Sequence, residues 1–317
     1  MSEREILVGV STCLLGEHVR YDAGHKHDRY ITGVLGRYFR LVPVCPEMEA
    51  GMGVPREPVR LVRERGAIRM LGVATGTDHT RSMQRYAARR VRELEALGLS
   101  GYILKRASPS CGMQRVRTYT TAGVRAPASR GLFAAALLDA MPALPVEEEG
   151  RLEDPRLRES FIERVFAHRR LYDGFAARWK LADLVALHTR EKMLLSAHSP
   201  AAAKELGRLV ASARTLPRAQ VEETYKRLFL KALTRPATPA RHVDVLQHIL
   251  GHFRDRLDRP ARNAIAAVIE QYRSGIVPLI VPITLIRHYV DVLGLEYLGG
   301  QSYLEPHPKE LMLRNHV

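Results

Sequence analysis

Three cysteines are the residues of this chain with the most distinctive chemistry. They are Cys13, Cys45 and Cys111, and each leaves an apolar run that is typical of a β-strand. An odd number of cysteines without a closely spaced pair does not form a complete disulfide framework. In a reducing compartment such thiols stay free or bind metal. The three strand ends are therefore treated as one candidate site.

The spacing of the cysteines narrows the kinds of site they could form. They are separated by 32 and 66 residues, which excludes the paired CxxC knuckles of structural zinc modules. A catalytic zinc with an open position and a [4Fe–4S] cluster with one iron free of protein ligands both accept thiolates. Buried, inert cysteines are the third interpretation. The spacing by itself leaves all three open.

The neighbours of the cysteines in the sequence are polar or small. Glu47 follows Cys45 by two residues, and two serines precede Cys111. A glycine after Cys111 suits close approach of the backbone to a ligand. The candidate residues of the site, besides the cysteines, are Arg20, Asp22, Glu47, Lys105, Ser108, Ser110 and Gly112.

Strands and helices alternate in the first half of the chain. Apolar runs predict strands at residues 5–11, 40–45 and 101–107, and a hairpin around Arg65-Gly66. Helices are predicted at residues 30–38, 131–141 and Thr80–Leu97, the last with one apolar face. This alternation predicts an α/β domain with a parallel, Rossmann-like sheet. Ligands of such sheets bind at the carboxyl ends of the strands, where the cysteines lie.

The second half of the chain has helical periodicity throughout. We expect an α/β domain at residues 1–143, a linker at 144–156 and an all-helical domain at 157–317. The acidic run Glu147-Glu148-Glu149 is interpreted as a solvated tether.

The net charge of +15 and the pI of about 10.1 indicate a polyanionic partner, most simply nucleic acid. Both halves are basic, and arginine, which binds phosphate bidentately, is the main cation. A composition biased towards arginine, with a benefit to solubility, is the alternative. No apolar run approaches 20 residues, and the N-terminus lacks the features of a signal peptide. We expect a cytoplasmic protein that does not associate with a membrane and has no obligate protein partner.

The stretches STCLLG…RYD, PVCPE…G…PRE and LK..SPSCG resemble the motifs of the thiouracil desulfidase (TudS-like) family over roughly residues 5–141. The resemblance implies a [4Fe–4S] cluster with three cysteine ligands, here Cys13, Cys45 and Cys111. It also implies a fourth iron that takes the sulfur of a thiolated pyrimidine. The chain departs from the family pattern at Ala23, where a glycine is expected, and at Ala50; we expect a change of loop shape there.

The second half is similar to a domain of once-unknown function that is fused to some desulfidase-like proteins. The similar stretches are LLSAH, LQHILGHFRDRL, PLIVPITLIRHY and YLGGQSYLEPHPKELMLRN. This layout occurs in tRNA 4-thiouridine desulfidases (RudS type). The resemblance thus implies tRNA as the partner and removal of sulfur from its 4-thiouridine.

These expectations give each candidate residue a role in a non-redox hydrolysis. Glu47 is the expected general base and acid, Ser108 and Ser110 orient the base or stabilise the oxyanion, and Lys105 holds negative charge. Arg20, Asp22 and Gly112 are expected to bind the substrate. The expected RNA contacts are Arg81, Arg85, Arg89, Arg169, Arg170 and Arg254.

Three alternatives compete with this hypothesis. The substrate could be free thiouracil or another thiolated nucleobase, with the helical domain serving stability or assembly. The chain could instead be a nucleic-acid-binding regulator whose cluster senses redox state without catalysis. It could also be a zinc-bound RNA module.

Overall fold

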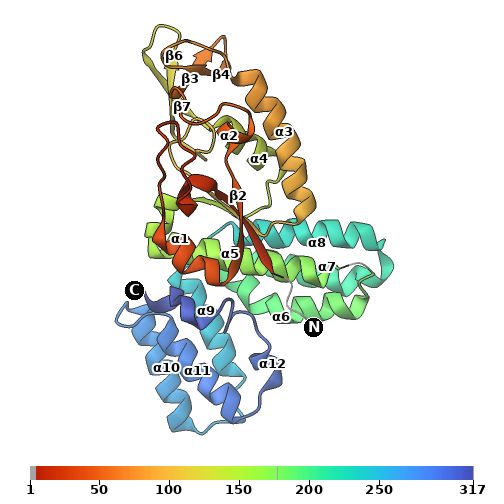
Figure 1. Cartoon of the computed structure of the whole chain (residues 1–317). Coiled ribbons are helices and arrows are strands. Elements are labelled where there is room, and N and C mark those ends of the chain that lie inside the picture. Colours follow the sequence, from red (N-terminus) through yellow and green to blue (C-terminus); the bar gives the residue numbers. More distant parts are fainter. Residues whose placement is uncertain (1–4, 177, 317) are drawn as a thin grey trace. The chain divides into compact units, whose positions relative to one another are not determined.

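The computed structural model describes residues 5–176 and 178–316, which fall into two compact units. The first unit ends at Leu157 and the second begins at Arg158. Figure 1 shows the strands in the first unit and helices throughout the second. None of the helices in the described residues has the length and apolar character needed to cross a membrane.

A four-stranded parallel sheet forms the centre of the first unit and confirms the α/β prediction. Its strands, in spatial order, are β2 (Phe39–Val44), β1 (Ile6–Ser11), β5 (Gly101–Leu104) and β8 (Val146–Glu148). In the register, Ser11 pairs with Val44, and Val10 pairs with Ile103. The carboxyl ends of these three neighbouring strands therefore lie at one edge of the sheet.

The prediction of a solvated linker at 144–156 is wrong. Residues Val146–Glu148 form β8, which pairs with β5, and the Glu147 and Glu148 side chains are buried. Both carboxylates have hydrogen-bond donors, which offsets the cost of removing them from water. Glu147 accepts from Arg151 Nε at 2.6 Å, and Glu148 accepts from the backbone N–H of Met113 at 2.8 Å. Glu147 and Glu148 thus belong to an edge strand of the sheet, and the hydrogen bonds of their carboxylates hold that strand in place.

A second sheet has the order β4-β3-β6-β7. Its predicted hairpin, β3 (Val59–Glu64) and β4 (Ala67–Gly72), is confirmed. The sequence did not predict β6 (Val116–Thr120) or β7 (Arg125–Ser129), which are short and rich in Arg and Thr. Strand β6 is held by parallel pairing to β3, more than fifty residues away, which a local pattern does not reveal.

Four helices complete the first unit, α1 (Arg29–Gly33), α2 (Pro46–Glu49), α3 (Thr80–Leu97) and α4 (Leu132–Ala140). Helix α3 agrees with its prediction at both ends, and its apolar face is buried in the core with Phe133 and Tyr102. The helix predicted over residues 30–38 is wrong in extent. Helix α1 is followed by a separate 3-10 turn, Leu35–Arg37, because Gly33 and Gly36 weaken a continuous α-helix.

The second unit is all-helical in the described residues, as predicted. It contains α5 (Pro155–Gly174, which begins in the first unit), α6 (Leu181–His198), α7 (Pro200–Ser212), α8 (Arg218–Leu233), α9 (Pro239–Gly251), α10 (Arg259–Arg273), α11 (Ile280–Val292) and α12 (Glu296–Gly299). Three of these helices begin with a capping side chain followed by proline in the first turn, at Ser199, Thr238 and Asp258.

The C-terminal segment is held to the helices of the second unit by buried charges. Arg314 donates hydrogen bonds to Glu163 at 3.0 Å and to the Tyr303 carbonyl at 2.6 Å. The other Glu163 oxygen lies 2.6 Å from His198 Nε2. Because each buried charge has a partner of opposite charge, these attractions offset the cost of removing the charged groups from water.

Gly9 gives a first test of the fold. The ideal Cβ of a residue at this position in β1 would lie 2.3 Å from the Tyr102 ring on β5. We expect Gly9→Ala to lower the free energy of unfolding by about 1–3 kcal/mol because the ring must shift within a packed core. Gly33→Ala is the control, since a Cβ there meets nothing within 4 Å. Urea unfolding followed by circular dichroism measures both; equal effects would contradict this packing.

His168 gives a test of pH dependence in the helical unit. Burial, with the nearby Arg164 and Lys226 charges, lowers the pKa of His168 to about 4. The unfolded chain binds a proton near pH 6.5, whereas the folded chain does not until about pH 4. The stability that this residue contributes is therefore present above pH 6.5 and is lost as the pH falls towards 4.

We expect His168→Phe to reduce the loss of unfolding free energy between pH 7.5 and pH 4 by about 3 kcal/mol. Fluorescence of Trp179, the single tryptophan, reports on this unit during urea unfolding. A variant with the same acid sensitivity as the parent chain would show that His168 is protonated without cost.

Candidate active site

The three cysteines line one cavity of about 320 Å³ at the carboxyl edge of the parallel sheet. Cys13 lies in the 3-10 helix Thr12–Leu15 that follows β1. Cys45 follows β2 directly and is the residue before α2. Cys111 lies in the loop after β5 and is buried. The fold thus brings together thiols that are up to 98 residues apart in the sequence.

The surroundings of the thiols disfavour the thiolate form. Burial, with the nearby Cys45, raises the pKa of Cys13 to about 11. Burial also raises the pKa of Cys45 and of Cys111. The Cys45 thiol points towards the Val19 carbonyl oxygen at 3.9 Å. A positively charged metal centre would compensate the three thiolates, as thiolate ligation requires.

The donor set of the cavity fits a soft metal centre. All three cysteines are free of disulfides, and sulfur ligands favour zinc, copper(I) and iron–sulfur clusters. Among the described residues, no three His, Cys, Asp or Glu side chains are gathered closely enough to hold a single ion. A cluster gives each thiolate its own iron, so its ligands can surround a cavity without converging on one point.

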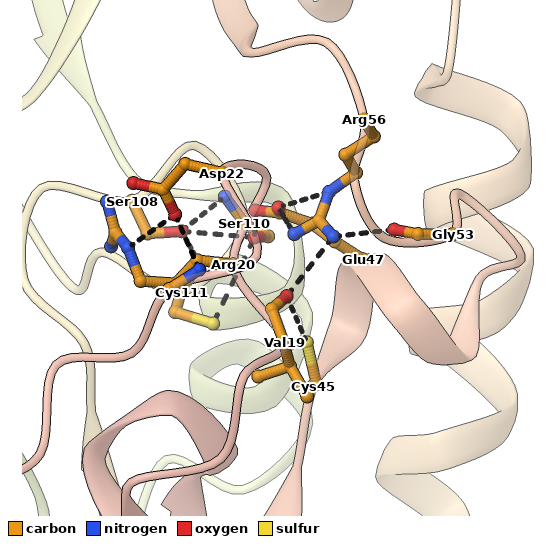
Figure 2. Close-up of polar contacts among 11 residues, drawn as sticks. Val19, Arg20, Asp22, Cys45, Glu47, Gly53, Arg56, Ser108, Ser110 and Cys111 are labelled. Carbon is orange, nitrogen blue, oxygen red and sulfur yellow. Dashed lines mark hydrogen bonds and ion pairs between the residues drawn. The ribbon is translucent and has the colours of Figure 1, made fainter.

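Glu47 lies in the wall of the cavity between a hydroxyl and a guanidinium (Figure 2). Its Oε1 accepts a hydrogen bond from Ser110 Oγ at 2.5 Å, and its Oε2 accepts from Arg56 Nε at 3.1 Å and from Arg56 Nη2. Arg56 also donates to the carbonyls of Val19 and Gly53 at 3.1 and 2.7 Å. The carboxylate is therefore fixed in orientation, with Oε1 as the oxygen beside Ser110.

Ser108 shapes the loop that carries Cys111. Its Oγ accepts from the backbone N–H groups of Ser110 and Cys111, at 3.2 and 3.1 Å. Gly112 closes this turn, because the Cβ of any other residue would lie 2.9 Å from the Ser108 carbonyl oxygen and 2.3 Å from Val116. Both serines line the cavity, whereas Gly112 is not one of its lining residues. Gly112 supports the loop, and the structure gives it no place in the cavity wall.

Lys105 and Arg20 line the cavity, and each has an acidic partner. The Lys105 ammonium pairs with Glu149, which also accepts from the backbone N–H of Arg106 at 2.7 Å. Arg20 Nε lies 3.5 Å from Asp22, which is exposed outside the lining.

The loop after Asp22 carries a departure from the family pattern. Ala23 holds φ at +55°, a conformation that favours glycine. His18 Nδ1 lies 2.8 Å from the Ala23 carbonyl oxygen, and Ala23 N–H donates to the Arg20 carbonyl at 3.0 Å. These hydrogen bonds hold the alanine in a backbone conformation that is costly for a residue with a Cβ.

Sequence reasoning missed several residues of the site. Arg56 stands in the stretch PRE, and its contact with Glu47 is the signal that only the fold provides. Glu149 belongs to the acidic run whose sequence indicates a tether, and in the structure it pairs with Lys105. Glu49 accepts from the Cys45 backbone N–H at 2.8 Å and from Tyr86 Oη at 2.7 Å, so it fixes the start of the loop at Cys45.

The arginines predicted to contact RNA differ in their exposure to solvent and in whether they already have a partner within the chain. Arg81, Arg85 and Arg89 are exposed on α3, and Arg254 is exposed after α9. Arg169 forms an ion pair with Asp173 at 2.7 Å. The prediction is contradicted for Arg170, whose guanidinium is bound to the buried Glu191 at 2.6 Å and to the Pro306 carbonyl at 2.7 Å.

Comparisons with known proteins match both halves of the chain. The family model described as 2-thiouracil desulfurase matches residues 8–149, and one described as a protein of unknown function (DUF1722) matches residues 192–308. The chain is 32% identical over 161 residues to the uncharacterized protein YbgA of Escherichia coli (strain K12). The aligned residues cover 50% of this chain and 95% of that relative.

Two further relatives each match a little less than half of this chain. The uncharacterized protein YbbK of Bacillus subtilis (strain 168) is 31% identical over 139 residues, covering 42% of this chain and 91% of that relative. A solved structure titled as the [4Fe-4S]-dependent thiouracil desulfidase TudS is 32% identical and covers 47% of this chain and 94% of that chain, with a TM-score of 0.38.

The pair of Glu47 and Arg56 can be tested by its effect on stability. The Arg56 side chain is 6% exposed, so Arg56→Met leaves a carboxylate uncompensated in the cavity wall. We expect the free energy of unfolding to fall by about 3–5 kcal/mol, as for other broken buried pairs. Adding Glu47→Gln should recover part of this loss, because no charge then lacks a partner. Urea unfolding of the single and double variants measures it.

Arg40→Met is the matched control, because the ion pair of Arg40 with Glu5 is exposed. We expect a change below about 1 kcal/mol. If Arg56→Met costs no more than Arg40→Met, Arg56 does not hold Glu47 in place.

Proposed function

This chain belongs to the 2-thiouracil desulfurase family, and from that membership we propose that it is a [4Fe–4S]-dependent desulfidase that converts 4-thiouridine in tRNA to uridine. The observation that carries the proposal is the composition of one cavity. Three thiols from three neighbouring strands surround it, and the oriented carboxylate of Glu47 lies in the same wall. A cluster site and a proton-transfer group are thus close enough to act on one substrate.

Cys13, Cys45 and Cys111 would hold the cluster through one thiolate each. When bound, the cluster supplies an iron without a protein ligand, which acts as a Lewis acid for a soft sulfur and polarises the carbon attached to it. The solved structure to which this chain is 32% identical is titled as [4Fe-4S]-dependent, and this agrees with the three-thiol cavity.

The reaction proposed is a hydrolysis without net electron transfer. Water oxygen forms a bond to C4 of the pyrimidine, the C4–S bond breaks, and the two protons of the water leave with the sulfur as hydrogen sulfide. Glu47 takes one proton from the water and later returns it. Because Arg56 occupies Oε2, the proton is handled at Oε1, which lies towards Ser110.

The other polar residues of the cavity position the substrate and the carboxylate. The Ser110 hydroxyl donates a hydrogen bond to Glu47 in this structure. When the water oxygen bonds to C4, the same hydroxyl can turn to donate to that oxygen. Arg20 and Tyr21 line the cavity, with the guanidinium 5.3 Å from the ring centroid, and offer a surface for a flat base. Lys105 contributes less positive potential than its charge suggests, because Glu149 compensates it.

Two features support tRNA as the substrate. The net charge of +15 favours a polyanion, and exposed arginines lie along α3. A free thiolated base is the second candidate, because the family description names 2-thiouracil. Activity on thiolated tRNA compared with free 4-thiouracil, each with anaerobically purified holoprotein, separates the two. A protein that holds a cluster and leaves both substrates unchanged would be the non-catalytic regulator.

Substitutions at the cysteines and at Glu47 test the two roles separately. We expect Cys111→Ser to lose the iron–sulfur absorption and the activity together. We expect Glu47→Gln to keep the absorption while 4-thiouridine loss slows by about 10²–10⁴-fold, since general acid–base catalysis contributes about that much. Glu95→Gln, an exposed carboxylate on α3, is the control and should match the parent chain.

Iron content and 4-thiouridine in digested tRNA are measured on the same preparations. Full activity of Cys111→Ser would contradict the cluster site. Full activity of Glu47→Gln would remove Glu47 from the chemistry and leave the cluster assignment intact.

A further inference from the structure

A second cavity lies within the helical unit, and none of the roles above uses it. It has a volume of about 550 Å³ and is formed mainly by α6 and α7, which run side by side (Figure 1). We call it the α6–α7 pocket. Its polar and aromatic lining residues are His188, Thr189, Lys192, Ser196, Lys204 and Tyr297.

The polar lining of the α6–α7 pocket is rich in hydrogen-bond donors. Lys192 and Lys204 are exposed, and within the described part of the chain no ion pair or hydrogen bond is formed by either side-chain ammonium group. None of the described lining residues is acidic. Two uncompensated ammonium groups at one concave surface create a positive potential that attracts anions. Most cations of the first cavity, by contrast, already have acidic partners.

His188 supplies a third donor in a defined orientation. Its Nδ1 lies 3.2 Å from Tyr225 Oη, for which the described residues offer no other acceptor. With the Tyr225 hydroxyl as the donor to Nδ1, the hydrogen of the neutral imidazole is on Nε2. That nitrogen points towards Gly207 in the pocket wall. Burial, together with the Lys192 charge, lowers the pKa of His188, so the ring is neutral at pH 7.

An aromatic side chain lies beside these donors. Tyr297 is 40% exposed and lines the pocket. The ring of His252 lies against it, with centroids 5.4 Å apart. Phosphate next to an exposed aromatic face is the arrangement with which proteins bind single nucleotides of an RNA strand.

We propose that the α6–α7 pocket binds a backbone phosphate of an RNA strand through Lys192, Lys204 and His188 Nε2–H, with the adjacent base against Tyr297. This rests on the proposed function, since it assigns one contact of the tRNA substrate. The pocket is well suited to phosphate because its lysines need no rearrangement of existing ion pairs to engage it. Lysine contacts to phosphate release counterions, so the contribution depends on salt.

Binding of tRNA without 4-thiouridine to the holoprotein tests the pocket apart from the chemistry. Fluorescence anisotropy gives the dissociation constant at several salt concentrations. We expect the double variant Lys192→Gln/Lys204→Gln to reduce the slope of log K against log salt by about 1–2, because each lost phosphate contact removes about 0.7–0.9. The control Lys231→Gln/Lys309→Gln removes the same charge at exposed positions outside the pocket and should change the slope by less than half as much.

A further arm distinguishes an RNA phosphate from a free phosphate ester. Titration with AMP and with inorganic phosphate is followed by calorimetry on the parent chain and both double variants. Lysine-dependent binding of AMP with unchanged tRNA binding would overturn the RNA contact and assign the pocket to a free nucleotide. Equal behaviour of the two double variants towards tRNA, AMP and phosphate would overturn the pocket altogether.

The two proposals fail differently. If the parent chain binds tRNA through the lysines and leaves 4-thiouridine intact, the desulfidase function is wrong and the pocket stands. If 4-thiouridine is lost while the pocket variant binds tRNA as the control does, the pocket is wrong and the function stands. Circular dichroism of each variant checks that the helices are retained.

Discussion

The parallel register of β2, β1 and β5 is the constraint on which the candidate site depends. Pairing of Ser11 with Val44 and of Val10 with Ile103 ends three strands at one level. Close approach of β5 to β1 requires Gly9, because the Tyr102 ring occupies the space of a Cβ. A slip of one residue would turn every side chain of the strand to the other face and move the loops that carry the thiols. The register of the sheet thus determines where the three cysteines lie relative to one another.

Charge compensation is the second condition of the cavity. Arg56 holds Glu47, and Glu149 holds Lys105, so the groups nearest to the thiols are already paired. In a buried wall an unpaired charge is costly, and pairing also fixes the orientation of the side chain. Burial raises the pKa values of the three thiols and so disfavours their thiolate forms. Under the proposed function, a metal cluster would supply positive charge that favours the thiolates, and the oriented Glu47 carboxylate lies in the wall of the same cavity.

The sequence predicted those parts of the fold whose signals are local. The one-sided apolar pattern located α3 at both ends, and the apolar runs located β1, β2 and β5 before the cysteines. It failed where distant partners decide. Glu147 and Glu148 resemble a tether until the pairing of β8 with β5 and the Met113 N–H donor place them in the buried sheet. Arg170 resembles a surface cation until Glu191, 21 residues later, binds it.

The two cavities differ in what their cations can do, and this difference argues for a division of roles. A cation that is paired with a carboxylate is a positioning group, because releasing it to bind a ligand would leave the carboxylate uncompensated. Arg56 and Lys105 are of this kind. An exposed cation without a partner loses little when an anion binds and gains counterion release when that anion is a polynucleotide. Lys192 and Lys204 are of this second kind among the described residues. Under the two proposals, the sulfur chemistry therefore belongs to the first compact unit and the phosphate contact to the second.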